Sequence, residues 1–342
     1  AQQYRGFGFG PPYVFGSGFL RFAECSFLGD FPFCTVELAD ETVPVRVEVS
    51  AWSPFIPLDV EASSLPVAVF DITLTNDTDA RVSVTVGLSV VGRSFPDYIS
   101  LETALQKQEV HLAWLGPVEY LLASEKELLS SRLVSNHLGV TAYGVQFLGH
   151  KDANLTRYYD AGTNHATAPA ASALPQFAGQ TPCLTTEKSL AGYWVPLGYL
   201  AQNAVSTQMP VLTKTYSGSI RAVYIKGICD FTATYAISSD PRTSSEVIQD
   251  LPDVIDRVPI IWISPAVIPN LSFSVSPLLP LPISAQITNY LLEFSRTEPG
   301  RQQLSALNAY EIARLEALPD DAYNDLRTLL AIQNVRLSSL LP

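Results

Sequence analysis

The chain of 342 residues is poor in charge. Only 16% of its residues are Asp, Glu, Lys or Arg, below the quarter typical of soluble domains, and the formal net charge is −12 at pH 7. Its 21 lysines and arginines form no basic run, whereas sequence-independent binding to nucleic acid needs clustered cations. The composition therefore argues against direct nucleic-acid binding. It predicts a largely neutral surface, covered by glycans or by partners.

Histidine is scarce, and paired carboxylates are missing. The four histidines show no His-x-His or His-x₃-His spacing, which argues against a zinc site. Glycoside hydrolysis needs two carboxyl groups facing each other, and the nearest approach, Asp59 with Glu61, fits a turn better. We therefore expect no cofactor and no enzymatic activity. The weak candidates for a metal site share one polar loop: His150, Asp152, Asp160 and His165.

Cysteine is sparse too, and the sequence does not decide whether the four cysteines form disulfides. Three disulfide pairings are available, and free buried thiols fit equally well; the residues are Cys25, Cys34, Cys183 and Cys229. The chain starts without methionine, which suggests a processed, exported product. The candidate glycosylation sites are Asn76, Asn154 and Asn270. We expect an extracellular or cell-surface location, with a virion as the alternative.

One long run lacks charge altogether. No charged residue lies between Arg257 and Glu293, but six prolines interrupt the run. Interior prolines break a helix, and irregular backbone is not tolerated in lipid. A transmembrane helix is therefore excluded. The run must lie against protein, either as a return strand or as a surface for another subunit.

What the sequence does have is a clear β pattern. Apolar residues alternate with polar ones over 43–50 and 68–75, a turn follows at 76–79, and the alternation resumes over 82–90. These segments predict an antiparallel meander. Short helices are expected over 98–136, interrupted at Gly116-Pro117, and a long polar loop over 150–185.

The loop between the first two of these strands has a distinctive sequence. The motif-bearing segments are Phe-Leu-Gly-Asp-Phe-Pro (27–32), Ser-Pro-Phe-Ile-Pro-Leu-Asp (53–59), Ser-Ser-Leu-Pro-Val-Ala-Val-Phe (63–70) and Thr-Asn (75–76), with a weaker echo at 217–220 and 231–235. They resemble the N-terminal β-sandwich of glycoside hydrolase family 116, the bile-acid β-glucosidase or glucosylceramidase type. The catalytic residues of that family lie in a helical barrel longer than the remaining chain. The resemblance thus implies a sandwich without an active site.

Together these observations predict a mainly β fold. We expect a large antiparallel β-sandwich with inserted loops and short helices, and a C-terminal helical hairpin. The expected parts are an aromatic, glycine-rich arm (1–22), the sandwich (23–242), the proline-rich apolar segment (243–300) and the helical hairpin (301–342).

The predicted function is structural: self-assembly of identical subunits into a surface layer, filament or capsid. The residues expected at the contacts are Phe7, Phe9, Tyr13, Phe15, Trp262 and Phe273. One alternative is a carbohydrate-binding or accessory domain of a family 116-like glucosidase, with sugar stacking on Tyr158, Tyr159 and Trp194. A viral jelly-roll capsid subunit is the other alternative.

Overall fold

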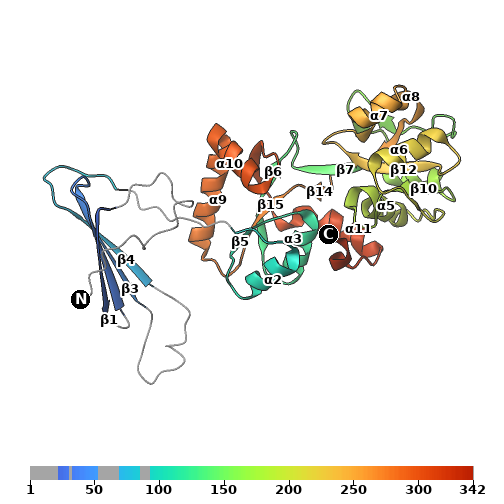
Figure 1. Cartoon of the computed structure of the whole chain (residues 1–342). Helices are drawn as coiled ribbons and strands as arrows, with labels where there is room; N and C mark the ends of the chain where they lie inside the picture. The colour runs from blue at the N-terminus through green and yellow to red at the C-terminus, as the bar shows by residue number, and fades with distance from the viewer. Residues whose placement is uncertain (1–21, 31–32, 53–68, 85–92, 342) are drawn as a thin grey trace, which may run out of the picture. The chain divides into compact units, whose positions relative to one another are not determined.

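A computed structural model of the chain describes residues 22–30, 33–52, 69–84 and 93–341 (Figure 1). The chain divides into two compact units, residues 1–92 and 93–342. Within the described ranges, no helix combines the length and apolar character needed to cross a bilayer. The expected contact residues Phe7, Phe9, Tyr13 and Phe15, and the carboxylates Asp59 and Glu61, lie outside these ranges.

The first unit contains an antiparallel sheet whose four strands lie in sequence order. Its strands are β1 (Glu24–Asp30), β2 (Phe33–Ala39), β3 (Val45–Trp52) and β4 (Val69–Asn76). Val49 stands opposite Val36 on one side and Ile72 on the other, so the alternation gathers apolar residues on one face. After β4, Asn76 accepts a hydrogen bond from the backbone N–H of Thr78 (3.0 Å). The predicted pairing of 43–50 with 68–75 and the turn after it are thus confirmed for the described residues. The expected return of the alternation over 82–90 is not: residues 82–84 form no strand, and 85–90 lie outside the described ranges.

The second unit has two lobes, and the first, lobe A, is built on a sheet of order β16-β6-β15-β5. The strands are β5 (Leu112–Leu115), β6 (Ser130–Asn136), β15 (Ser272–Val275) and β16 (Arg314–Ala317). The helices of this lobe are α2 (Tyr98–Gln106), α3 (Pro117–Glu125), α9 (Leu281–Arg296) and α10 (Glu298–Asn308). Two short helices lie in the stretch 98–136 as predicted, and α3 begins at Pro117, because proline begins a helix readily. The strands β5 and β6 occupy the rest of this stretch, which the sequence analysis had interpreted as helical.

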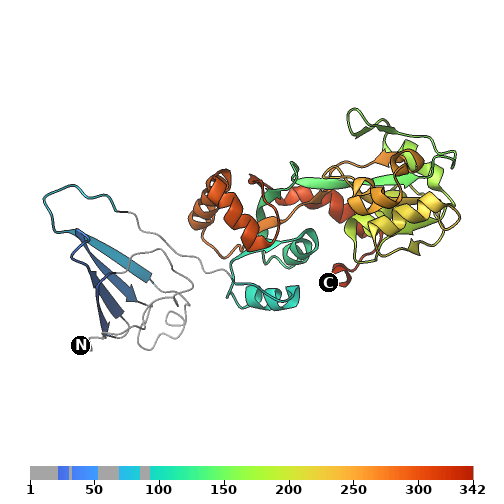
Figure 2. The same cartoon turned by 45° about the horizontal axis from the view of Figure 1, so that its top comes forward.

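Lobe B is built on a sheet of order β11-β10-β12-β7-β13 (Figure 2). Its strands are β7 (Ala142–Gly149), β10 (Pro182–Leu184), β11 (Val211–Leu212), β12 (Phe231–Ala236) and β13 (Ile260–Ile263), with the pair β8 (Tyr159–Asp160) and β9 (His165–Ala166) beside them. Its helical segments are α4 (Ala170–Ala173), η2 (Leu174–Phe177), η3 (Leu190–Trp194), α5 (Val195–Gln202), α6 (Tyr216–Ile225), η4 (Pro241–Thr243), α7 (Ser245–Asp250) and α8 (Val254–Arg257).

Two neighbouring passages of chain join the lobes. One runs from β6 into β7, and the other runs from β13 through β14 (Ile268–Pro269) into β15. They touch at Gly144, where an added Cβ would lie 2.6 Å from the carbonyl oxygen of Pro265. The backbone N–H of Val145 donates to Oγ of Ser264 (2.9 Å). The crossing of the two strands therefore requires glycine at position 144.

An aromatic cluster fills the core of lobe B beside the crossing. The Phe147 ring lies 5.5 Å from that of Phe177 and 5.8 Å from that of Trp262, and the rings of Phe177 and Phe231 are 4.4 Å apart. Trp262 is 2% exposed, and its indole N–H donates to the carbonyl of Ala168 (3.0 Å). Such close aromatic contacts stabilise a core beyond the area they bury.

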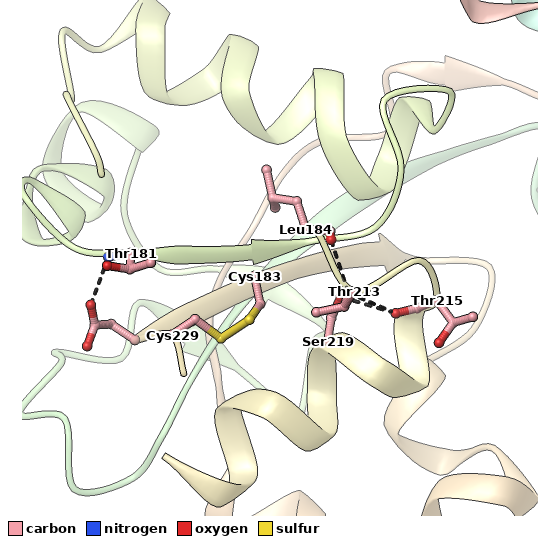
Figure 3. Close-up of a disulfide and its surroundings, with 8 residues drawn as sticks. Thr181, Cys183, Leu184, Thr213, Thr215, Ser219 and Cys229 are labelled. Atoms are coloured by element: carbon pink, nitrogen blue, oxygen red, sulfur yellow. Dashed lines mark hydrogen bonds between the residues drawn. A yellow bond between two sulfur atoms is a disulfide. The ribbon is translucent and has the colours of Figure 1, made fainter. Parts of the chain in front are cut away.

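A disulfide joins Cys183 in β10 to Cys229, two residues before β12, with a Cα–Cα distance of 5.6 Å (Figure 3). It is buried among apolar residues of α6, including Ile220 and Val223. The sequence left this pairing open. Cys25 and Cys34 of the first unit are free, and Cys25 is exposed.

The prediction of a mainly β fold is wrong. Most of the second unit is mixed α/β, and helix α6 occupies 217–220, where the sequence carries the weaker echo of the sandwich motif. The reason is local: Thr215 caps the helix by accepting a hydrogen bond from Gly218 N–H (3.0 Å), and Ile220 and Val223 fall on one helical face.

The predicted C-terminal helical hairpin is also wrong. Between α10 and α11 (Asn324–Ile332) lies β16, which pairs with β6, so Ile312 and Leu315 do not continue a helix. Short turns of 3₁₀ helix, η5 (Asp320–Tyr323) and η6 (Leu337–Leu340), flank α11. The spacing of the apolar residues alone did not distinguish the half-buried strand β16 from a helix.

Removing the disulfide should destabilise the second unit. We expect Cys183→Ala with Cys229→Ala to lower the free energy of unfolding by about 2–4 kcal/mol, because the cross-link restricts the unfolded chain. Urea denaturation measures the change. The matched control is Cys25→Ala with Cys34→Ala, which removes two free thiols. Equal stability of the two double variants would contradict the structural role of this bond.

Candidate functional site

The segment that follows β10 begins a continuous helical stretch, η3 and then α5. Ser189 stands before η3, and its Oγ accepts a hydrogen bond from the N–H of Gly192 (2.9 Å). The N–H of Thr185 donates to the carbonyl of Gly192 (3.1 Å). An added Cβ at Gly192 would lie 2.1 Å from Oγ1 of Thr185, so only glycine allows this packing. Thr185 is 3% exposed, and its hydroxyl has no hydrogen-bond partner in the described part of the chain.

The start of α6 lies beside this segment. Oγ1 of Thr213 lies 3.0 Å from the carbonyl oxygen of Leu184 and 3.3 Å from that of Thr215 (Figure 3). These bonds attach the start of α6 to the end of β10. Two helix starts are thereby positioned at the same end of the short strand β10, and the N–H groups of a first turn are available to acceptors.

Tyr216 connects the two helix starts. It is the first residue of α6, and its hydroxyl lies 3.2 Å from Oγ of Ser189. Its ring packs edge-on against the ring of Tyr235 in β12, with centroids 4.9 Å apart. Burial raises the pKa of the Tyr216 hydroxyl, while the bond to Ser189 opposes that shift. The phenol therefore stays protonated at neutral pH and can donate a hydrogen bond.

Two further tyrosines extend the group to the lobe crossing and to lobe A. Tyr143 precedes Gly144 in β7; burial raises its pKa, and so do the nearby hydroxyls of Tyr216 and Tyr310. Tyr310 belongs to lobe A, where its ring lies 4.5 Å from that of His137. We call Ser189, Tyr216, Tyr235, Tyr143 and Tyr310 the crossing cluster. All five keep part of their surface exposed.

The crossing cluster carries mainly hydroxyl groups. Besides burial, other tyrosines and Ser189 perturb the pKa values of Tyr143 and Tyr216, and burial followed by the carboxylate of Glu311 raises the pKa of Tyr310. The helix starts of η3 and α6 add partial positive charge. Hydroxyl donors beside two helix starts suit the oxygens of an anion. The arrangement holds no activated nucleophile of the kind that covalent catalysis needs.

The three predicted sugar-stacking residues do not belong to the crossing cluster. Tyr158 packs against the main core, and Tyr159 donates its hydroxyl to the side-chain oxygen of Asn164 (2.8 Å). Trp194 belongs to η3, but its indole N–H donates to the carbonyl of Glu187 (2.5 Å). Each of these rings therefore has a local structural contact.

The four candidate metal ligands make hydrogen bonds to neighbouring groups of the protein. Asp152 bonds to Lys226 (2.8 Å), and its backbone N–H donates to Nδ1 of His150 (3.1 Å). Asp160 accepts from the N–H of Gly162 (2.9 Å), and Nδ1 of His165 lies 2.5 Å from the carbonyl oxygen of Thr163. Across the described residues, no three His, Cys, Asp or Glu side chains form a group that could hold a metal ion.

The candidate glycosylation sites differ in accessibility. Asn76 and Asn154 are exposed. Asn270 is 4% exposed, and its amide nitrogen donates to the carbonyls of Ser135 (3.3 Å) and Val140 (2.8 Å). Those bonds help attach β15 to the β6–β7 turn, and they leave Asn270 no room for a glycan in the folded chain.

The sequence reasoning missed the crossing cluster. A signal was present: Ser189 and Thr215 each precede a glycine by three residues and each caps a helical segment. The proximity of Tyr143, Tyr216 and Tyr310 had no such signal, because these residues come from distant parts of the chain.

The second unit thus has two lobes joined by neighbouring strand passages, with a polar cluster beside the junction, an architecture found in two-lobed proteins that close around ligands. Residues 77–323 match the sequence model of a family described as the phosphonate periplasmic substrate-binding protein of ABC transporters. Because that match covers more than half of the chain, the chain belongs to this family. Residues 7–111 match the model of the N-terminal domain of glycosyl-hydrolase family 116, described as beta-glucosidase 2, so the resemblance found in the sequence holds for this part. No curated protein matches the chain.

Three solved structures that align with this chain illustrate the comparison. PhnD1 from Prochlorococcus marinus, in complex with methylphosphonate, is 14% identical, with a TM-score of 0.44, over 70% of this chain and 84% of that one. A binding-protein component of an ABC phosphonate transporter from Pseudomonas aeruginosa is 18% identical, with a TM-score of 0.42, over 70% and 74%. A chloride-bound protein from Xanthomonas citri is 14% identical, with a TM-score of 0.49, over 72% and 83%. The family assignment rests on the sequence model alone.

The family match corrects the predicted function and partners. A substrate-binding protein binds small ligands, so the expected self-assembly into a layer, filament or capsid is wrong, as are the carbohydrate role, the homo-oligomeric and glycan partners and the jelly-roll alternative. Trp262 and Phe273, expected at subunit contacts, are 2% and 3% exposed inside their lobes. The expected lack of enzymatic activity is confirmed, and so, in its general form, is a location outside the cytoplasm.

The buried histidine gives the protein a predictable response to acid. Burial lowers the pKa of His150 below its ordinary value of 6.5, and the positive charge of Lys226 adds to this effect. The folded chain keeps the ring neutral, while the unfolded chain binds a proton below about pH 6.5. The free energy of unfolding should therefore fall as the pH drops from 7 to 5.

This response is measured by urea denaturation at pH 7, 6 and 5. We expect His150→Asn, which keeps an acceptor for the N–H of Asp152, to reduce the pH dependence. The exposed His165→Asn is the matched control and should leave the slope as it is. A slope unchanged by His150→Asn would show that His150 is not the group responsible.

Proposed function

We propose that the chain is the ligand-binding component of an ABC importer and that it binds a small oxyanion at the crossing cluster. The observation that carries this proposal is the hydrogen bond between Tyr216 and Ser189, which brings the starts of η3 and α6 together. Helix starts with free N–H groups and hydroxyl donors are suited to phosphonate-like groups. The family description supports the same ligand class.

Hydroxyl groups and helix starts set the mode of recognition. They would balance the ligand's charge, with hydrogen bonds from Tyr216, Ser189 and the buried hydroxyl of Thr185. Hydrogen bonds to a charged group are stronger than those between neutral groups. The unpartnered hydroxyl of Thr185 would then gain an acceptor.

The N-terminal segment has a different role in this proposal. Residues 7–111 match the N-terminal domain of family 116, and residues 77–323 match the substrate-binding family, so the two matches overlap over 77–111. We infer that the family 116-like segment is an additional module without the catalytic helical barrel of that family.

The test is isothermal titration calorimetry of the full chain with methylphosphonate, inorganic phosphate and methanesulfonate, with glucose as a neutral comparison. We expect at least one oxyanion to bind and glucose not to bind. Tyr216→Phe removes one hydroxyl and should weaken oxyanion binding on the order of tenfold to hundredfold, the value of a hydrogen bond to a charged group.

The matched control is Tyr290→Phe, which removes the hydroxyl of an exposed tyrosine in α9 and should leave affinity unchanged. Equal affinity of Tyr216→Phe and the unaltered chain would exclude the crossing cluster as the site. Failure of all three oxyanions to bind would overturn the proposed ligand class.

A further inference from the structure

The C-terminal segment touches both lobes of the second unit. After β16 the chain enters η5 beside β6, where the N–H of Leu318 donates to the carbonyl of Arg132 (3.0 Å). It then forms α11, which packs on α5 of lobe B, and η6, which packs on α3 of lobe A. This is a third connection between the lobes, in addition to the two passages at the crossing.

The attachment to lobe A is polar and combines the buried Tyr120 with a partly exposed ion pair of Asp320 and Arg327. The Tyr120 hydroxyl in α3 donates to Oδ1 of Asp320 (2.5 Å) and accepts from the N–H of Ser131 (3.1 Å). Arg327 donates to the same oxygen of Asp320 (2.6 Å) and to Oγ of Ser124 (3.0 Å). We call Tyr120, Ser124, Asp320 and Arg327 the α3 lock. Hydrogen bonds within such a charged network depend on both direction and distance, so the α3 lock holds the start of α11 in a defined position on α3.

The aromatic packing supports the same attachment. Tyr120 and Tyr323 are both fully buried, with ring centroids 4.3 Å apart. Tyr323 immediately precedes α11. The first turn of α11 is therefore fixed to α3 by ring packing as well as by hydrogen bonds.

The attachment to lobe B is mostly apolar contact. Gly198 of α5 lies so close to α11 that an added Cβ would be 2.7 Å from the carbonyl oxygen of Leu329. We call the contact between α5 and α11 the seam. Among the described residues, one side-chain hydrogen bond crosses it, from the amide of Gln333 to the carbonyl of Leu197 (3.3 Å). A cavity of about 220 Å³ opens along the seam, lined by Tyr199, Gln202, Asp325, Thr328 and Leu329.

The two attachments therefore differ in how they respond to lobe movement. Hydrogen bonds to Asp320 and Ser124 are lost when groups shift by an ångström or two, whereas apolar helix surfaces slide by small steps in shear motions. Helix α5 is continuous with η3, which Ser189 caps. Movement of α5 along α11 would thus move Ser189 relative to lobe A and to Tyr310 of the crossing cluster.

We propose that α11 is an interlobe strap, fixed to lobe A by the α3 lock and free to slide on α5, which sets the balance between open and closed lobes. The functional consequence rests on the proposed ligand-binding role. A protein whose binding-competent state is less populated binds its ligand more weakly in proportion. Weakening the lock should therefore widen the range of interlobe distances and lower apparent affinity.

The test measures interlobe distance directly. In a background of Cys25→Ser and Cys34→Ser, spin labels are placed on two exposed positions, Tyr290→Cys in lobe A and Met209→Cys in lobe B. Pulsed electron spin resonance gives the distance distribution without and with methylphosphonate. Arg327→Gln should broaden the distribution of the ligand-free chain and weaken methylphosphonate binding on the order of threefold to tenfold.

Arg221→Gln is the matched control, since it breaks exposed ion pairs to Glu246 and Asp250 within lobe B, and it should change neither readout. Gly198→Ala approaches the same seam from lobe B and should also shift the distances, which covers the case in which Arg327→Gln does not fold. An unchanged distribution in the folded lock variant or in Gly198→Ala would overturn the strap. If no oxyanion binds, the ligand-free distances still decide the question, so the two proposals fail separately.

Discussion

The close approach of two strands at Gly144 is the constraint on which the second unit depends. Because an added Cβ would lie 2.6 Å from the Pro265 oxygen, a side chain there would separate β7 from the β13–β14 bend. The hydrogen bond from Val145 to Ser264 (2.9 Å) closes the same contact. This crossing positions the two lobes relative to each other. It also positions Tyr143, one residue from Gly144, within the crossing cluster.

The chemistry beside the crossing follows from backbone geometry more than from charge. Ser189 and Thr215 cap two helical segments, and Tyr216 joins them through one hydroxyl contact. A chain with so few charged residues can present an anion site in this way, since peptide N–H groups and phenols carry the interaction. The tyrosines remain donors because burial raises their pKa values.

The sequence was most informative where structure is local. The pairing of β3 with β4 and the start of α3 at Pro117 were predicted because alternation and a Gly-Pro pair act within a few residues. The weaker echo of the sandwich motif at 217–220 was misleading, because Thr215, outside that window, starts a helix there. Residues 312 and 315 were assigned to a helix because their spacing fits one, although pairing with β6, far away in the chain, makes them strand or turn.

The sequence by itself determined the low charge, the N-terminal family 116 resemblance and the exclusion of a membrane helix from the proline-rich run, because composition and short motifs carry that information. Only the tertiary structure decided that this run supplies the return strands β13 to β15, that Trp262 and Phe273 are core residues, and that Cys183 pairs with Cys229. The crossing cluster likewise needed the fold, since its tyrosines meet through strand pairing and helix packing between distant segments, and no local pattern encodes such a meeting.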